Sequence, residues 1–338
     1  METVRTLFAD PVVSDEGDLT GTRDYDTYAA SFETASDRKW EIVGPHLRPG
    51  RVLDIGCATG GLLAKAAADP VFFESDLFGV DIARPLLAEA EHKKQAGVFA
   101  NPNIWFIRAN VLSTAVMPDR SVDSTVTVAL THEISSYGAG RQDVDTFARR
   151  IYAHTRPGGV WVNSDVMGPA DPDRLVRLHL RTDSTTLTEA RTDLDDLDPA
   201  QVKDFLEGLA PAGRMVQFAF DFPRLSGAPW CGTPVGDAAA GVWEVSLRTA
   251  MEFMTRKDYT DNWLSECHER FCDLSYADWE RLLGQAGFTL DGASGPVRNE
   301  WLVEHRFDPD AELFDLDGRR VAWPDTHVLT IARRTTAE

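Results

Sequence analysis

The segment Val52–Gly61, VLDIGCATGG, places an acid and closely spaced glycines at the end of an apolar run. The run Arg51–Ile55 is too short for a helix and predicts a buried strand. Glycines after it let the backbone approach a ligand, and the helix expected next offers unpaired N–H groups at its start. About 25 residues later, Asp81 ends a second apolar run, where a carboxylate can accept both hydroxyls of a ribose. The spacing therefore predicts a site for a nucleoside cofactor.

Asp54 discriminates between two cofactor classes. Gly56, Ala58 and Gly61 also match the dinucleotide fingerprint loosely, which leaves a nicotinamide oxidoreductase as an alternative. An acid two residues before the first glycine would repel a pyrophosphate, whereas a cofactor with a free amine and a sulfonium gains from it. S-adenosylmethionine (SAM) is such a cofactor, and the sequence favours it.

The rest of the chain supplies the elements that must position these residues. Apolar runs alternate with helical segments as far as Val166, a pattern typical of βαβ units and a parallel sheet covered on both faces. The expected strands are Arg51–Ile55, Phe78–Val80, Ile104–Arg108, Ser124–Leu130, Val160–Val166, Phe288–Leu290 and His327–Ala332, and the expected helices are 24–46, Gly61–Ala68, Arg84–Gln95, Asp143–His154 and Ser275–Ala286. An α/β fold follows.

With its motifs in this order, the chain resembles the class I SAM-dependent methyltransferases. VLDIGCATGG is similar to their first motif, with Ala58 in place of the middle glycine, and FGVDIA to their ribose-binding strand. RPGGVWVNSDV resembles the turn into their fifth strand, and HVLTIARR their last strand. The resemblance covers residues 24–167 and 275–334 and implies a Rossmann-like, doubly wound sheet, mostly parallel with an antiparallel last strand. It also implies that S-adenosylhomocysteine is the product.

The resemblance further implies which residues hold the cofactor. The glycine turn would line the methionine moiety, the end of the second strand the ribose, the residues after the third strand the adenine, and an N-terminal helix would cover the site. The implied cofactor-binding residues are Tyr25, Tyr28, Asp54, Gly56, Ala58, Gly60, Asp81, Ile82, Asn110, Val111 and Leu130.

The regular alternation breaks near Gly168. We expect an N-terminal helical segment over 1–50, a SAM-binding domain over 51–167 and 273–338, and a mainly helical insertion over 168–272. A stretch of this length is uncommon without a function, so we interpret the insertion as a substrate lid.

Candidate catalytic residues follow the fourth strand. His132 has an ordinary pKa suited to proton abstraction near neutral pH, and Glu133 can orient it. Tyr137 is a candidate for the acceptor pocket. Each has a plain structural alternative, in packing or in a solvated ion pair. No metal is expected, because Cys267, His268 and Cys272 lack the spacing of a zinc site.

Composition narrows the partners. The chain has 338 residues and a formal net charge of −20, which disfavours nucleic acids and anionic membranes. Its four cysteines form no CxxC pair, and no signal peptide or apolar span is evident, so we expect a cytoplasmic protein. A homodimer is compatible with these features.

Together these features predict a SAM-dependent methyltransferase that acts on a small molecule, with a role in bacterial secondary metabolism. The first alternative keeps SAM and breaks another sulfonium bond. It would close the amine into azetidine-2-carboxylate or transfer the aminocarboxypropyl group, releasing methylthioadenosine. The second alternative is a non-catalytic binding protein, which the intact glycine turn and Asp81 disfavour.

Overall fold

The computed structural model describes residues 36–336, so the predicted cofactor contacts Tyr25 and Tyr28 lie outside the described residues. The chain divides into two compact units. The first comprises the described residues up to Asp165 together with 278–295 and those from Val328 onward, and the second comprises Val166–Ala277 and Pro296–His327.

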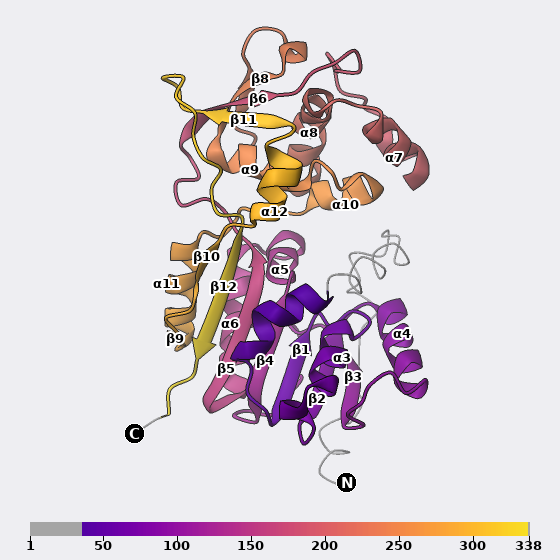
Figure 1. Ribbon diagram of the computed structural model, residues 1–338, viewed down its shortest axis with the longest axis vertical. Helices are drawn as coiled ribbons and strands as arrows, with labels where there is room; N and C mark the ends of the chain where they lie inside the picture. The colour runs from indigo at the N-terminus through magenta and orange to yellow at the C-terminus, as the bar shows by residue number, and fades with distance from the viewer. Residues whose placement is uncertain (1–35, 337–338) are drawn as a thin grey trace. The chain divides into compact units, whose positions relative to one another are not determined.

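The first unit is built on a sheet that contains eight strands in the described residues, in the order β10-β12-β5-β4-β1-β2-β3, with β9 also paired to β12. Strands β1 to β5 pair in parallel, and β12 runs in the opposite direction (Figure 1). The strands are β1 (Arg51–Ile55), β2 (Asp76–Asp81), β3 (Ile104–Arg108), β4 (Val122–Val128), β5 (Thr155–Val166), β9 (Thr289–Leu290), β10 (Gly295–Val297) and β12 (His327–Arg333). This is the Rossmann-like sheet with an antiparallel last strand that the motifs implied.

Helices cover both faces of this sheet. Alternate residues of β5 point to opposite faces: Val160 and Val162 join the core beneath α3 and α4, whereas Trp161 contacts Phe147 of α6 and Trp279 of α11. Residues 36–43 are helical and pack with α3, because Val43 belongs to the same core. The helices are α3 (Gly61–Ala68), α4 (Arg84–Gln95), α5 (Thr131–Tyr137), α6 (Arg141–His154) and α11 (Tyr276–Ala286).

Most of these boundaries agree with the expected ones, and the main addition is α5. This helix of seven residues begins three residues after β4, and no glycine or proline marks the boundary in the sequence. The acceptor at its start is Asp165, more than thirty residues away in the chain. A cap supplied from so far away leaves no local signal in the sequence.

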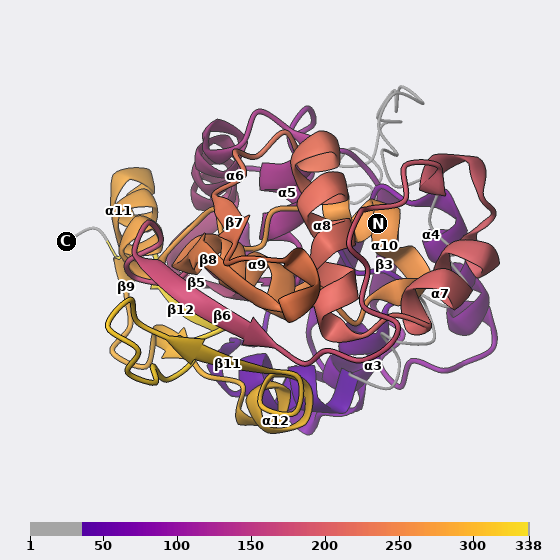
Figure 2. The ribbon, with the colours of Figure 1, turned by 90° about the horizontal axis from the view of Figure 1, so that it is seen from above.

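The second unit contains a four-stranded antiparallel sheet, in the order β11-β6-β8-β7 (Figure 2). We expect a mainly helical insertion over 168–272, and the unit is rich in helices but also contains this sheet. The unit includes 296–327 as well, because β11 pairs with β6. Its elements are β6 (Leu175–Leu180), α7 (Pro199–Glu207), α8 (Pro211–Ser226), β7 (Gly232–Pro234), β8 (Val242–Ser246), α9 (Leu247–Arg256), α10 (Trp263–His268), α12 (Glu300–Leu302) and β11 (Ala311–Phe314).

Aromatic packing holds the helices of the second unit together. Phe218 of α8 lies within 5.4 Å of Phe253 of α9 and 6.2 Å of Trp263 of α10, measured between ring centroids. All three side chains are buried in one hydrophobic core with the inward residues of β6 and β8. The unit therefore has a core of its own, as expected for a segment that folds as a compact body.

Within residues 36–336, none of the helices combines the length and the apolar character needed to cross a bilayer.

Candidate active site

The glycine turn after β1 is held by its own backbone. The N–H groups of Gly56 and Cys57 donate to the carbonyl of Val80, at 2.8 and 3.1 Å. Gly56 and Gly60 have φ values of 76° and 80°, which glycine adopts without strain. Ala58 also has a positive φ, 47°, which is unfavourable for a residue with a Cβ. Its N–H donates to Asp81 at 2.8 Å, and this bond helps to hold the turn in place.

A cavity opens beside this turn, and it contains both an acid and a base. Asp54 is 3% exposed, and burial raises its pKa to about 7, with a further increase from the charge of Asp81. Burial lowers the pKa of Lys39 to about 8, although the carboxylates of Asp54 and Asp165 act in the opposite direction. The lining residues are Ser36, Lys39, Asp54, Gly56, Cys57, Ala58, Thr59, Gly61, Leu62 and Val128.

Asp81 ends β2 and is half-buried. One carboxylate oxygen accepts from the N–H of Ala58, and the other accepts from the N–H of Ala83 at 2.9 Å. A carboxylate oxygen has two lone pairs, which suits Asp81 to accept the hydroxyls of a ribose. Ile82, between these residues, is half-buried and accepts from Arg108 through its carbonyl.

Asn110 follows β3 and is half-buried. Its Oδ1 accepts from the N–H of Leu112 at 2.9 Å, which shapes the turn that also contains Val111. The amide thus uses one acceptor position on its own loop and keeps its NH2 group as a donor. Neither residue lines the cavity beside the glycine turn.

Asp165, near the end of β5, accepts hydrogen bonds from the residues that follow β4. The two strands are paired up to Val128 and Ser164, so Asp165 lies where the chain enters α5. Its Oδ2 accepts from the N–H groups of Leu130 and Thr131 at 3.1 and 2.6 Å and from the Thr131 hydroxyl at 2.6 Å. This carboxylate therefore caps the first turn of α5, where the N–H groups have no helical partner.

The same carboxylate orients His132. Nδ1 of His132 lies 2.6 Å from Oδ1 of Asp165, whose side chain is fully buried, while that of His132 is 10% exposed. An ionised carboxylate can only accept, so Asp165 favours the form of His132 in which Nδ1 carries the proton. A histidine held in this way is arranged as a base.

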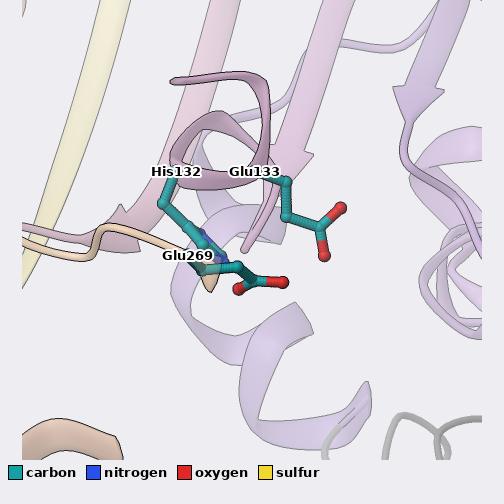
Figure 3. A group of neighbouring side chains, drawn as sticks. All are labelled: His132, Glu133 and Glu269. Carbon is teal, nitrogen blue, oxygen red and sulfur yellow. The ribbon is translucent and has the colours of Figure 1, made fainter. Parts of the chain in front are cut away.

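The other predicted residues of this region lie on or beside α5. Glu133 and His132 extend from its first turn (Figure 3), and Tyr137 is its last residue and is half-buried. Glu269, drawn in the same view, belongs to the second unit. The group that lies against Nδ1 of His132 is Asp165. Leu130 contacts the glycine turn, since a Cβ on Gly56 would come within 3.0 Å of its side chain.

Ser36, Lys39 and Asp165 are residues of this site that were not among the predicted ones. Asp165 had a readable signal, because the carboxyl ends of neighbouring parallel strands meet at one edge of the sheet. The sequence signal for Ser36 and Lys39 was weaker: they are polar residues three positions apart on an otherwise apolar helix face.

The comparisons with known proteins bear on this part of the chain. Residues 52–159 match a family model described as a methyltransferase domain. Over this segment the chain is similar to methyltransferase domains. The predicted resemblance to class I SAM-dependent methyltransferases is confirmed, and so is SAM as the cofactor. The match covers less than half of the chain and does not reach the second unit.

Solved methyltransferase structures are similar to the chain at low identity. One from Methanosarcina mazei is 14% identical over 88% of this chain and 98% of its own, with a TM-score of 0.45. One from Mesorhizobium loti is 15% identical over 86% and 93%, with a TM-score of 0.44. A geranyl diphosphate C-methyltransferase from Streptomyces coelicolor is 11% identical over 98% and 88%, with a TM-score of 0.47. Similarity at this level does not indicate the substrate of this chain. No curated protein matches the chain.

Proposed function

We propose that this methyltransferase transfers a methyl group from SAM to an oxygen or nitrogen of a small molecule, with His132 as the base. The contact between Nδ1 of His132 and Oδ1 of Asp165, 2.6 Å, carries the proposal. A cytoplasmic role in bacterial secondary metabolism remains part of it. The formal charge of −20 supports a small molecule rather than a nucleic acid as the acceptor.

The residues present suit the cofactor chemically. Asp54 is a buried carboxylate beside the glycine turn and matches an ammonium group, and Asp81 has lone pairs for the ribose hydroxyls. Asn110 and Val111 would lie toward the adenine. Bound SAM supplies a methyl group on a positively charged sulfur, ready for in-line displacement. The protein therefore has to position the acceptor and remove its proton.

Asp165 and His132 have different roles in proton transfer: Asp165 orients the imidazole, and His132 is the base. Asp165 keeps the proton of His132 on Nδ1, so that Nε2 takes the proton of the acceptor hydroxyl or amine as the new bond to carbon forms. The resulting imidazolium stays beside the buried carboxylate, which stabilises its charge. Tyr137, at the other end of α5, would contact the acceptor.

Replacing His132 with alanine is expected to lower turnover at least about tenfold, because a positioned general base typically contributes that much or more. SAM affinity should be unchanged, since His132 is assigned to the acceptor and is held by Asp165 at the start of α5. S-adenosylhomocysteine release, measured by mass spectrometry, gives the rate. His92→Ala, at an exposed position on α4, is the matched control. Equal turnover in the wild type and His132→Ala would remove His132 from the mechanism.

SAM binding is expected to depend on pH through Asp54. Its pKa of about 7 is raised, so the ionised form that pairs with an ammonium is lost as the pH falls below 7. The Kd should be about fivefold higher at pH 6 than at pH 7, as the ionised fraction falls. Calorimetry at the two pH values measures this ratio. Asp54→Asn should bind SAM more weakly and with a flat profile, and a retained fivefold ratio in that variant would contradict the assignment.

The substrate class is tested by the source of the acceptor. With SAM carrying an isotopically labelled methyl group, we expect label to enter compounds of the ultrafiltered, low-mass fraction of a bacterial extract. Label that enters only the retained protein or nucleic acid would overturn the small-molecule proposal and leave the methyltransferase assignment intact.

A further inference from the structure

Two polar residues of the helical segment 36–43 face the cavity at the glycine turn. Ser36 and Lys39 are three positions apart, which places them on the same side of a helix, and both line the cavity. Ser36 lies close to the turn, since a Cβ on Gly61 would come within 2.5 Å of its hydroxyl oxygen. This segment therefore supplies a cation and a hydroxyl to the same cavity that contains Asp54.

The backbone of the glycine turn has few donors left for an anion. Four of its N–H groups donate within the protein: those of Gly56 and Cys57 to Val80, that of Ala58 to Asp81, and that of Gly60 to the carbonyl of Cys57 at 2.8 Å. A negatively charged ligand group in this cavity can therefore be matched by the N–H groups at the start of α3, where Gly61 and Leu62 line the cavity, and by side chains. Lys39 is the cationic residue among those that line it.

We infer that Lys39 binds the carboxylate of the methionine moiety of SAM, while Asp54 binds the ammonium group on the same carbon. This inference rests on the proposed function, because it assigns a contact within the cofactor site. An acid and a base in one cavity complement a zwitterionic amino acid, and a lysine ammonium pairs with a carboxylate as a point charge. Lys39 thereby selects cofactors that keep an intact amino acid end.

The electrostatics of the cavity agree with this role. Burial lowers the pKa of Lys39 to about 8, while the carboxylates of Asp54 and Asp165 act in the opposite direction. A ligand carboxylate beside Lys39 would likewise favour its charged form. Asp54 acts on Lys39 in the same direction, which places the two groups within electrostatic reach of each other.

The test compares three ligands by calorimetry at pH 7: SAM, decarboxylated SAM, and methylthioadenosine, which lacks the whole amino acid end. The wild type should bind SAM about tenfold more tightly than decarboxylated SAM, as expected for a charge-assisted contact. In Lys39→Met the two affinities should become equal within about twofold, and methylthioadenosine should bind as in the wild type. Lys39→Arg should restore part of the preference.

Lys94→Met is the matched control. Lys94 is a half-buried lysine of α4 that does not line the cavity, so its loss should keep the preference for SAM. Binding of methylthioadenosine shows that Lys39→Met is folded, and Lys39→Gln gives a second reading of the same ratio. An unchanged preference in Lys39→Met and Lys39→Gln would overturn the inference and leave the proposed function standing. A wild type that binds none of the three ligands would overturn the proposed function itself.

Discussion

Asp165→Asn is expected to lower turnover about a hundredfold or more, because the correct tautomer of a catalytic histidine depends on its partner. The carboxylate accepts from Nδ1 of His132 and leaves the lone pair on Nε2. An asparagine amide in the same place can present its NH2 group to Nδ1. The proton then moves to Nε2, and the imidazole can no longer take a proton from the acceptor.

The substitution should spare much of the local structure. The amide oxygen of asparagine can still accept from the backbone at the start of α5, where Oδ2 of Asp165 now accepts from Leu130 and Thr131. SAM affinity and far-UV circular dichroism should therefore change little while the rate of S-adenosylhomocysteine release falls. Glu133→Gln removes a neighbouring acid without touching Nδ1 and should have a much smaller effect. An equal loss of rate in both variants would contradict the assigned role of Asp165.

Lys257→Met is expected to destabilise the second unit by about 3 kcal/mol, because removing one partner of a buried ion pair leaves the other uncompensated. Lys257 has no exposed side-chain surface, and its Nζ lies 2.8 Å from Asp258 and 2.5 Å from Asp310. Asp310 precedes β11, so this contact joins the two chain segments that form the unit. Arg181 also contacts Asp310, at 3.0 Å, which keeps the expected loss at the lower end of the range.

Urea denaturation followed by tryptophan fluorescence measures this change, since Trp243 and Trp263 belong to the core of the unit. Lys203→Met is the control, because Lys203 pairs with Glu207 and Asp261 at the surface and should contribute little. If the two lysine variants unfold at the same urea concentration, the buried contact does not stabilise the unit as argued.

The fold of the first unit could be predicted because the sequence patterns that indicate it lie within short segments of the chain. The apolar run Arg51–Ile55, the glycines after it and Asp81 at the end of the next strand each have a direct physical reading, and the structure places them together. β4 is the least exact of these strands. It ends two residues before the expected Leu130, because the chain turns at Ala129 with a φ of 54° and enters α5.

The remainder depends on contacts between distant residues. His132 was a candidate base, but its partner Asp165 is 33 residues away and becomes its neighbour only because β4 and β5 are adjacent. The second sheet was missed for a similar reason. The alternation in Leu175–Leu180 is short, and its antiparallel partner in Ala311–Phe314 lies more than a hundred residues later. Lys39 carries no motif, and only the cavity shows that it lies near Asp54.

The nucleoside product of SAM tests the central claim most directly. The protein is incubated with SAM and the low-mass extract fraction, and the nucleoside is identified by mass spectrometry, with a parallel sample that lacks the extract. Methyl transfer predicts S-adenosylhomocysteine, formed in step with a methylated acceptor and absent without the extract. Methylthioadenosine, formed with SAM alone, would show that another sulfonium bond is broken and would contradict the account.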